Sequence, residues 1–512
     1  MRSKAQKACT YTIVRGGQMY RMGLKKQIAM FQEPIDFSGV SLNPKNRWIK
    51  MSKLIPWDIF EEKYSKNFEG SKTGKPAKPA RMALGAHIIK EKLKLSDEET
   101  VEAILESPYL QYFIGLNQFT HKEPFDSSTI CWFRKRLTSE MLSELNDYII
   151  GRKTVEEKKD DDDGNPSAGS SCNKRSGETE ISAEPKNKGT IILDATCTPA
   201  DISFPTDVTL LNEGREKLEE IIDTLHEAGV TEGKKKPRTY RKKARKQYLR
   251  FAKNRKPKKK DIRRAVKTQL SYVRRDLKHI DKLISAGGEN HLTEKQKQYL
   301  TTIKTLYEQQ AQMHKTKTHT VDKRIVSIHQ PWVRPIVRGK ASAAVEFGAK
   351  ISISVLGGYA RIERLDWEAY NESTTLIETV DRYFEQTGYY PERVLADKIY
   401  RTRENLRYCE ANGIRMNGPK LGRPPKDKRL YHQQCKLEQS EAGERNAVEG
   451  KFGEGKRTYN LGRIKMRLQG TSEAGIHLVF LVMNLEKRLR AFLRLFLESL
   501  YGGWLKPLRI AL

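Results

Sequence analysis

Residues 189–195, Gly-Thr-Ile-Ile-Leu-Asp-Ala, form a short apolar run that a glycine and an aspartate bound. Runs of this kind, rich in β-branched residues, are typical of buried β-strands. Residues 393–398, Arg-Val-Leu-Ala-Asp-Lys, have the same arrangement, a short apolar run followed by an aspartate. Each run therefore predicts a strand with a carboxylate at its exit, Asp194 in the first and Asp397 in the second.

The sequence between these two runs predicts further strands and helices. Residues 345–356 and 359–365 have the alternation of strands, and Gly357-Gly358 between them favours an antiparallel hairpin. A third strand is expected over residues 324–328, and a helix over residues 374–388. The order of these elements predicts a mixed α/β sheet with acidic residues at its strand ends.

Two aspartates at one sheet edge have a chemical consequence. If their strands are neighbours, the carboxylates of Asp194 and Asp397 repel each other, and the pKa of one of them rises. A bound Mg²⁺ ion removes the repulsion and prefers oxygen ligands. The alternative interpretation is that each aspartate forms a turn or caps a helix, which is the commoner role for a single strand-end aspartate.

A third carboxylate, Glu449, lies in a segment with helical character. Arg445 precedes it by one helical turn and Lys456 follows it by two, so one face presents a cation, a carboxylate and a cation. This pattern is expected either of a metal ligand flanked by phosphate-binding cations or of a surface ladder of ion pairs. The spacing leaves three other acids open as the third ligand. They are Glu441, Glu444 and Glu454.

These motifs resemble those of the DDE transposases of bacterial insertion sequences. The similar segments are Leu193-Asp194-Ala195-Thr196, Leu395-Ala396-Asp397-Lys398, and Arg445, Glu449 and Lys456 in the spacing Arg-x₃-Glu-x₆-Lys. Residues 330–335 and 445–453 are also similar to this group, as is the helical N-terminal part. The family's tyrosine before the arginine is replaced by Ala442, which puts the role of that tyrosine in doubt.

The resemblance implies a fold and a reaction. The fold class would be α/β, a ribonuclease-H-like mixed sheet flanked by helices, with an N-terminal all-helical domain and a basic helical insertion. Two Mg²⁺ ions, for which Mn²⁺ is a plausible substitute, would act in cleavage of element ends and transfer of the 3′-OH into target DNA. Asp194 would bridge the ions, and Asp397 and Glu449 would each complete one. Arg445 and Lys456 would hold phosphates, and a homodimer would form the synaptic complex.

The composition independently favours a nucleic-acid partner. The 512 residues carry a formal net charge of +32, and a polyanion is the usual partner of such an excess. Residues 234–260 contain 16 Lys and Arg and no acid, with aromatic residues interleaved. This segment is expected to contact double-stranded DNA, both terminal inverted repeats and target. The residues predicted to make the contacts are Lys242, Lys243, Arg245 and Lys246.

Composition and periodicity together predict the domain organisation. The expected parts are an N-terminal extension (1–44), a helical DNA-binding domain (45–150), a flexible linker (151–189), a catalytic domain (190–500) with a basic helical insertion (229–320), and a C-terminal tail (501–512). No apolar run approaches the roughly 20 residues that span a bilayer, and the first residues lack a signal-peptide core. We therefore expect no membrane partner and a bacterial cytoplasmic, nucleoid-associated protein.

Three rival functions remain open at this point. A nuclease of the same fold would cut DNA without joining it, and the three carboxylates do not separate the two. An inactive or architectural DNA-binding relative would bind without cutting. A polybasic membrane-associated protein would need an anchor that the sequence lacks.

Overall fold

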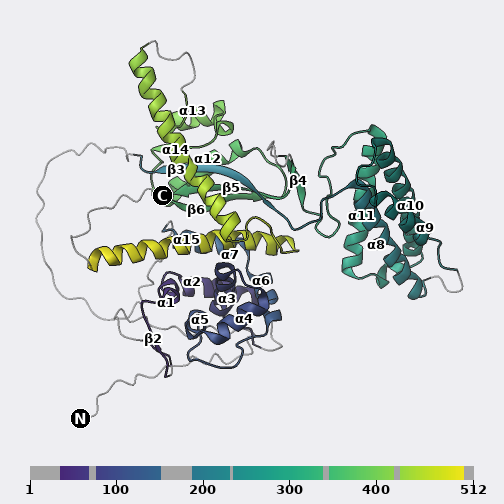
Figure 1. Ribbon diagram of the computed structural model, residues 1–512, viewed down its shortest axis with the longest axis horizontal. Coiled ribbons are helices and arrows are strands. Elements are labelled where there is room, and N and C mark those ends of the chain that lie inside the picture. The colour runs from purple at the N-terminus through teal and green to yellow at the C-terminus, as the bar shows by residue number, and fades with distance from the viewer. Residues whose placement is uncertain are drawn as a thin grey trace, which may run out of the picture. The chain divides into compact units, whose positions relative to one another are not determined.

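The computed structural model describes residues 35–37, 39–68, 76–151, 187–230, 235–337, 345–419 and 427–500, with side chains up to residue 492. Most of the predicted linker and N-terminal extension and all of the predicted tail lie outside these residues. The chain divides into two compact units, residues 1–155 with 481–512, and residues 156–480. The elements of both are labelled in Figure 1.

The first unit is built from helices, as predicted for residues 45–150, with a small β-ribbon before them. Polar side chains cap the first turns of α1, α4, α5, α6 and α7. Ser96 and Glu99 form the reciprocal capping box that the sequence favours, with Ser96 Oγ accepting from the Glu99 N–H at 3.1 Å. The elements are β1 (Ile35–Asp36), β2 (Ser41–Leu42), α1 (Arg47–Ser52), α2 (Trp57–Ser65), α3 (Ala80–Leu93), α4 (Asp97–Glu106), α5 (Pro108–Phe113), α6 (Ser127–Arg136) and α7 (Ser139–Ile149).

The last helix, α15 (Gln469–Leu500), contributes its second part to this unit. Glu486 is nearly buried there and pairs with Arg47 and Lys92, both at 2.9 Å. Asn484 is fully buried and donates to Asn146 Oδ1 at 2.8 Å. The apolar run of α15 is thus a core helix with its polar groups satisfied. No helix among the described residues is long and apolar enough to cross a membrane.

The second unit contains a mixed sheet, as predicted. The strands are β3 (Thr190–Pro199), β4 (Arg334–Val337), β5 (Val345–Leu356), β6 (Tyr359–Asp366), β7 (Arg393–Leu395) and β8 (Arg415–Met416). Their order is β4-β5-β3-β7-β8, with β6 also paired to β5. The pairs among β3 to β6 are antiparallel, whereas β3–β7 and β7–β8 are parallel. Figure 1 shows β3, β5 and β6 together in this sheet.

Glycines shape β5 at two places. Gly357 and Gly358 both have positive φ, and they form the tight turn of the predicted β5–β6 hairpin. Gly348 lies so close to β3 that a Cβ atom there would be 2.0 Å from the carbonyl oxygen of Thr198. The closeness of the β3–β5 pairing therefore depends on a residue without a side chain.

Two helices pack against the parallel side of the sheet. They are α12 (Thr375–Thr387), which ends at the left-handed Gly388, and α13 (Arg403–Ala411). Leu376 and Val380 of α12 are fully buried in one cluster with Ile191, Leu193 and Val394 of the strands. The apolar residues before each aspartate are therefore the core that fixes β3 and β7.

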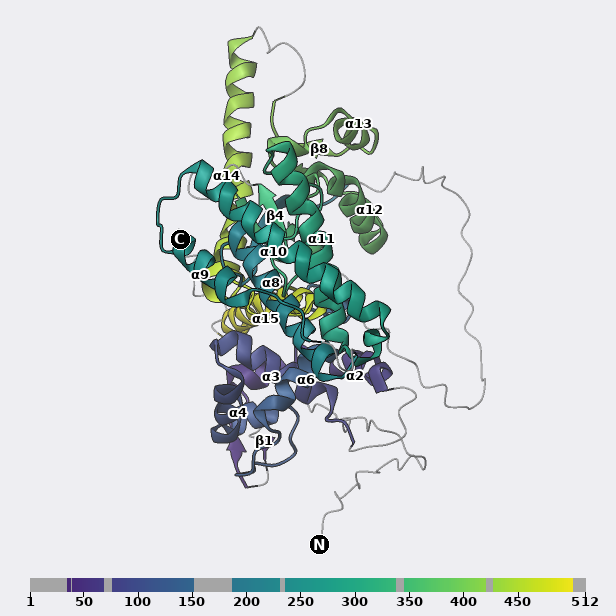
Figure 2. The ribbon, with the colours of Figure 1, turned by 90° about the vertical axis from the view of Figure 1, so that its right-hand side faces the viewer.

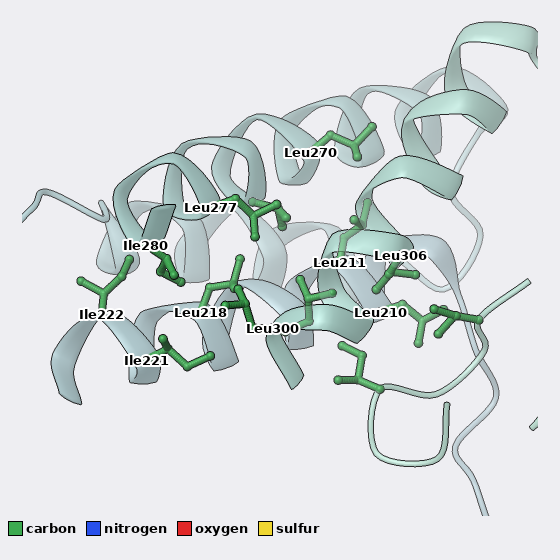
Figure 3. Packing of buried hydrophobic residues seen from close by; sticks show 14 of the residues in the cluster. Leu210, Leu211, Leu218, Ile221, Ile222, Leu270, Leu277, Ile280, Leu300 and Leu306 are labelled. Atoms are coloured by element: carbon green, nitrogen blue, oxygen red, sulfur yellow. The ribbon is translucent and has the colours of Figure 1, made fainter. Parts of the chain in front are cut away.

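The basic insertion is a helical bundle. Its helices are α8 (Asp207–Glu227), α9 (Arg241–Ala252), α10 (Lys259–Ser285) and α11 (Glu294–Thr316), and Figure 2 shows them from the side. Leucine and isoleucine side chains from α8, α10 and α11 form its core, among them Leu218, Ile222, Leu277, Ile280 and Leu300 (Figure 3). Since α8 supplies part of this core, the bundle begins before residue 229; the predicted domain bounds otherwise stay a prediction.

The strand predicted over residues 324–328 is wrong. This segment has no strand partner and packs on the bundle, where Ile325 and Ile328 join the helical core. The side chain of Gln309 in α11 accepts from the Ile325 N–H at 3.0 Å and donates to the carbonyl of Lys323 at 3.1 Å. A buried glutamine thus satisfies the backbone groups that a neighbouring strand would otherwise bind.

Truncation of the bundle core should loosen it. Leu218→Ala leaves a cavity at a fully buried position, and such cavities cost about 2–5 kcal/mol. Hydrogen exchange of α8, α10 and α11 in the full chain, followed by mass spectrometry, should speed up accordingly. Leu249→Ala on α9, where the side chain is 45% exposed, is the matched control and should change little. Equal protection in both variants would contradict this core assignment.

Candidate active site

The pairing of β3 with β7 brings the two predicted aspartates to one edge of the sheet. The strands run parallel, and Ile192 pairs with Leu395 at the last register position. Asp194 and Asp397 each lie two residues further along their own strand. Because parallel strands stay in register, the two residues occupy matching positions. Asp397 lies just beyond β7, but Asp194 lies within β3, which continues to Pro199, so the predicted strand end at Asp194 is wrong.

Asp194 is partly buried and has an unusual acidity. Burial, together with the weaker effects of the negative charges of Glu372 and Asp397, raises the pKa of its carboxyl to about 6. The N–H of Ala195, which donates to Asp194 Oδ1 at 2.8 Å, and the positive charge of Arg445 oppose that rise. The predicted carboxylate repulsion is therefore present, although burial has the larger effect on the pKa.

Asp397 is exposed and also serves as a cap. Its Oδ1 accepts from the Lys398 N–H at 2.7 Å, at the start of the short 3₁₀ helix Lys398–Tyr400. The capping role that a single strand-end aspartate commonly has is thus present here. The cap uses one carboxylate oxygen and holds the side chain at the strand end, so capping and metal binding are compatible.

Helix α14 (Lys428–Thr458) crosses this edge and is held to three strands. Glu441 pairs with Arg415 of β8, and Glu444 pairs with Arg393 of β7 at 3.1 Å. Further along, the Nζ of Lys456 donates to Thr196 Oγ1 of β3 at 3.0 Å. The part of α14 before Glu441 is mostly exposed and extends away from the sheet in Figures 1 and 2.

These contacts give α14 a direction along β3. From Glu444 to Lys456 the helix advances about 18 Å at 1.5 Å per residue. The strand advances about 20 Å from Thr190, the register partner of Arg393, to Thr196. Glu449 therefore lies on the stretch of α14 that runs beside the strand carrying Asp194.

Glu449 itself is 60% exposed, and Arg445 Nη2 lies 3.7 Å from its Oε1. The positive charge of Arg445 also lowers the pKa of Asp194, so Arg445 interacts with both carboxylates. The three rival acids have closer cationic partners than Glu449 does, since Glu441 and Glu444 bind strand arginines and Glu454 pairs with Lys451 at 3.0 Å. The contacts favour Glu449 among the four.

Within the described parts of the chain, no three His, Cys, Asp or Glu side chains come together as a group that could hold a metal ion. The donor types do fit Mg²⁺, because Asp194 and Asp397 offer carboxylate oxygens from adjacent strands and burial disfavours the anionic form of Asp194. A divalent cation would favour that anionic form. Among the described residues, the predicted ligand set of Asp194, Asp397 and Glu449 is thus not assembled into a metal site.

Sequence reasoning missed Glu372. It precedes α12, where it gives no strand-end or spacing signal, yet it acts on Asp194 more strongly than Asp397 does. Lys350 of β5 pairs with it at 2.8 Å and also donates to the Tyr370 carbonyl at 2.8 Å. Lys350 thus neutralises a carboxylate beside Asp194, and only the pairing of distant segments shows this.

The basic residues predicted to contact DNA lie on α9. Lys242, Lys243, Arg245 and Lys246 are all exposed there. Arg241 at the helix start binds Asp223 of α8 at 2.6 Å, which fastens α9 to the bundle. The structure therefore presents these four cations to solvent.

The acidity of Asp194 predicts a pH-dependent stability. Its folded pKa of about 6 exceeds the ordinary 3.8, so the fold loses stability as pH rises from about 4 through about 6. Asp194→Asn should match the wild type near pH 4 and be more stable near pH 8, by at most about 3 kcal/mol. Thermal unfolding without divalent ions measures this. The exposed Asp322→Asn is the control, and a pH-independent difference for Asp194→Asn would contradict the assignment.

The anchoring acids of α14 should differ from Glu449 in their effect on structure. Glu441→Ala removes the buried partner of Arg415 and should cost about 1–2 kcal/mol, so the amides of α14 should exchange faster. Glu449→Ala, at an exposed position, should leave their exchange unchanged. Hydrogen exchange of both full-length variants tests this difference, and faster exchange in Glu449→Ala would overturn it.

Comparisons with known proteins agree with the motifs. Residues 394–486 match the family described as "Transposase DDE domain", and residues 39–136 match "Transposase domain (DUF772)". An uncharacterized protein, ORF8 in the nfe locus of Rhizobium meliloti, is 35% identical over 116 residues. That match covers 23% of this chain and 54% of the relative, so the chain spans about half the length of the relative.

No solved structure matches the chain. The first family match contains Asp397 and Glu449, and the second falls on the helices of the first unit. These matches support a transposase role. Two separate parts of the chain thus match transposase families, and the chain is similar to the DDE transposases of insertion sequences.

Proposed function

We propose that the protein is a DNA transposase that cleaves element ends and transfers the resulting 3′-OH into target DNA. The observation that carries the proposal is the parallel β3–β7 pairing, which sets Asp194 and Asp397 at matching positions, together with the helix that carries Glu449 along β3. The family matches, one in the N-terminal helical part and one over residues 394–486, support a transposase role.

The strand order supports the ribonuclease-H-like fold within this proposal. Three antiparallel strands, β6, β5 and β3, are followed across the sheet by two parallel strands, β7 and β8. The first carboxylate is on the central strand β3, the second follows β7, and the third is on a later helix. A mixed sheet flanked by helices, with the three acids in this order along the chain, is what the resemblance implies.

The chemistry divides among named side chains. Asp194, Asp397 and Glu449 would hold two Mg²⁺ ions, which when bound clamp the attacking and leaving oxygens of an in-line displacement. Glu449 would turn from Arg445 toward the aspartates, and Arg445 would then be free to bind a phosphate oxygen. Lys456, held at Thr196 of the same strand, would bind a second phosphate on the other side of the carboxylates.

DNA binding is assigned to two other surfaces in this proposal. The helices of the first unit would bind the terminal inverted repeats, as proposed for residues 45–150. The cations of α9 would bind phosphates without reading sequence. A homodimer that holds two element ends is part of the proposal through the resemblance alone.

The direct test is cleavage of a labelled duplex that bears the element's own end, with Mg²⁺. Asp194→Asn, Asp397→Asn and Glu449→Gln should each lower the rates of cleavage and joining by more than about 100-fold. Mutation of residues that only hydrogen-bond to metal ligands already lowers activity by about 10–100-fold, and loss of a ligand should cost more. All three should bind the duplex as the wild type does. Glu438→Gln, the matched control on the part of the same helix before Glu441, should keep activity.

The outcomes separate the rivals. Cleavage without joining of the 3′ end would indicate a nuclease. Binding without cleavage by the wild type would indicate an architectural protein. Full activity of Glu449→Gln would exclude that residue as a ligand, and the anchoring acids of α14 would then be tested in its place.

A further inference from the structure

Helix α10 carries a row of exposed cations along one face. The row consists of Lys260, Arg264, Lys267, Arg274, Lys278 and Lys282, hereafter the α10 stripe. Their spacings of three, four and seven residues keep them on the same side of an α-helix. We propose that the α10 stripe binds the phosphate backbone of double-stranded DNA, on an element separate from the carboxylates of β3 and β7. The choice of DNA as partner rests on the proposed function.

The positive charges of the α10 stripe are not neutralised by close ion pairs within the described part of the fold. Arg264 lies 3.8 Å from Asp261 and its side chain is still 71% exposed. Among the described residues, no carboxylate lies within ion-pair distance of Lys267 or Arg274. The acid that interrupts this side of the helix, Asp281, is paired with Lys304 of α11 at 2.9 Å. The face therefore keeps its positive charge.

Without a bound partner, repulsion between the cations of the α10 stripe destabilises the helix. Arg274, Lys278 and Lys282 follow at intervals of four residues, the spacing at which like charges destabilise a helix. A surface that only had to be soluble would alternate charges of both signs. Binding of a polyanion removes the repulsion and releases the counterions of the polyanion.

The shape of the stripe favours a duplex over a single strand. Lys260 and Lys282 are 22 residues apart, which corresponds to about 33 Å along a straight helix. One turn of B-DNA has about the same length, 34–36 Å. A rigid line of charges matches a rigid duplex, whereas single-strand sites combine cations with aromatic side chains for base stacking. No aromatic residue belongs to the stripe.

Helix α9 lies directly beside the stripe. Tyr272 of α10 donates to Gln247 of α9 at 2.8 Å, and the guanidinium of Arg275, next to Arg274 in the chain, stacks on Tyr240 at 5.0 Å. Six of the twelve residues of α9 are Lys or Arg and none is acidic. Figures 1 and 2 show α9 alongside α10. The exposed cations of α9 thus widen the same surface.

The surface is also held rigidly. The opposite face of α10 packs into the bundle core through Val273, Leu277 and Ile280, and the same core includes α8 and α11 (Figure 3). The positions of the cations are therefore set before DNA binds, which limits the conformational entropy that binding would cost.

The test uses the full chain and a duplex unrelated to the element's ends, so that neither cleavage nor terminal-repeat recognition contributes. The stripe variant is K267Q/R274Q/K278Q, and the matched control is K295Q/K315Q/K317Q, which removes three exposed charges from α11 and the residue after it. Circular dichroism verifies that both variants are folded. Duplex affinity is measured over a series of salt concentrations.

We expect the stripe variant to bind roughly tenfold or more weakly, and its salt slope to fall by about 0.9 for each phosphate that the variant no longer neutralises. The control should stay within about twofold of the wild type. Equal losses of affinity in both variants, or none in the stripe variant, would overturn the proposal. A larger loss on single strands or on anionic vesicles than on the duplex would overturn the choice of partner.

Failure of this proposal is distinguishable from failure of the proposed function. Asp194→Asn should bind the unrelated duplex with wild-type affinity and salt slope. If the wild type never cleaves its element's end but the stripe variant still loses duplex binding, the transposase proposal fails and the stripe stands. If cleavage occurs but the stripe variant binds like the control, only the stripe assignment fails.

Discussion

The parallel pairing of β3 with β7 is the interaction on which the site depends. The two strands are far apart in the chain, and only three residue pairs join them. Those pairs set Asp194 of β3 level with Asp397 after β7, so that the charge of Asp397 acts on Asp194. Burial of the apolar residues before each aspartate, Leu193 and Leu395 among them, stabilises the pairing. The same apolar core raises the pKa of Asp194 and makes a cation favourable there.

The acidic residues of helix α14 have two different roles, anchoring the helix and, in the proposed function, binding metal. Glu441 and Glu444 bind arginines of β8 and β7, which fixes the helix against the parallel edge. Glu449 is more exposed than either and is paired only loosely with Arg445. A carboxylate that must join a metal site has to be able to move, and one that anchors a helix has to stay. The contacts of α14 follow this division of roles.

In the helical insertion, apolar and charged residues lie on different faces of the helices. The apolar faces form the core, and the charged faces are exposed. Leucines and isoleucines of three helices make an apolar core. Acids such as Asp223 and Asp281 are used in ion pairs between helices. Exposed cations lie on the outer sides of α9, α10 and α11. The large positive charge of the chain is thus organised on a rigid frame.

The sequence by itself determined the elements that depend on local pattern. The hairpin at Gly357-Gly358, the cap at Ser96 and the mixed α/β class follow from periodicity and turn residues, because these act over a few neighbours. The same patterns placed a strand end at Asp194, but β3 continues to Pro199 because its second half pairs with β5. A local pattern misassigned residues 324–328 for the same reason, since a distant side chain, Gln309, satisfies that backbone. Only the tertiary structure decided which strands pair, which acids of α14 are anchors, and that Glu372 acts on Asp194. Those outcomes depend on contacts between residues distant in the chain, and spacing along a sequence carries no information about such contacts.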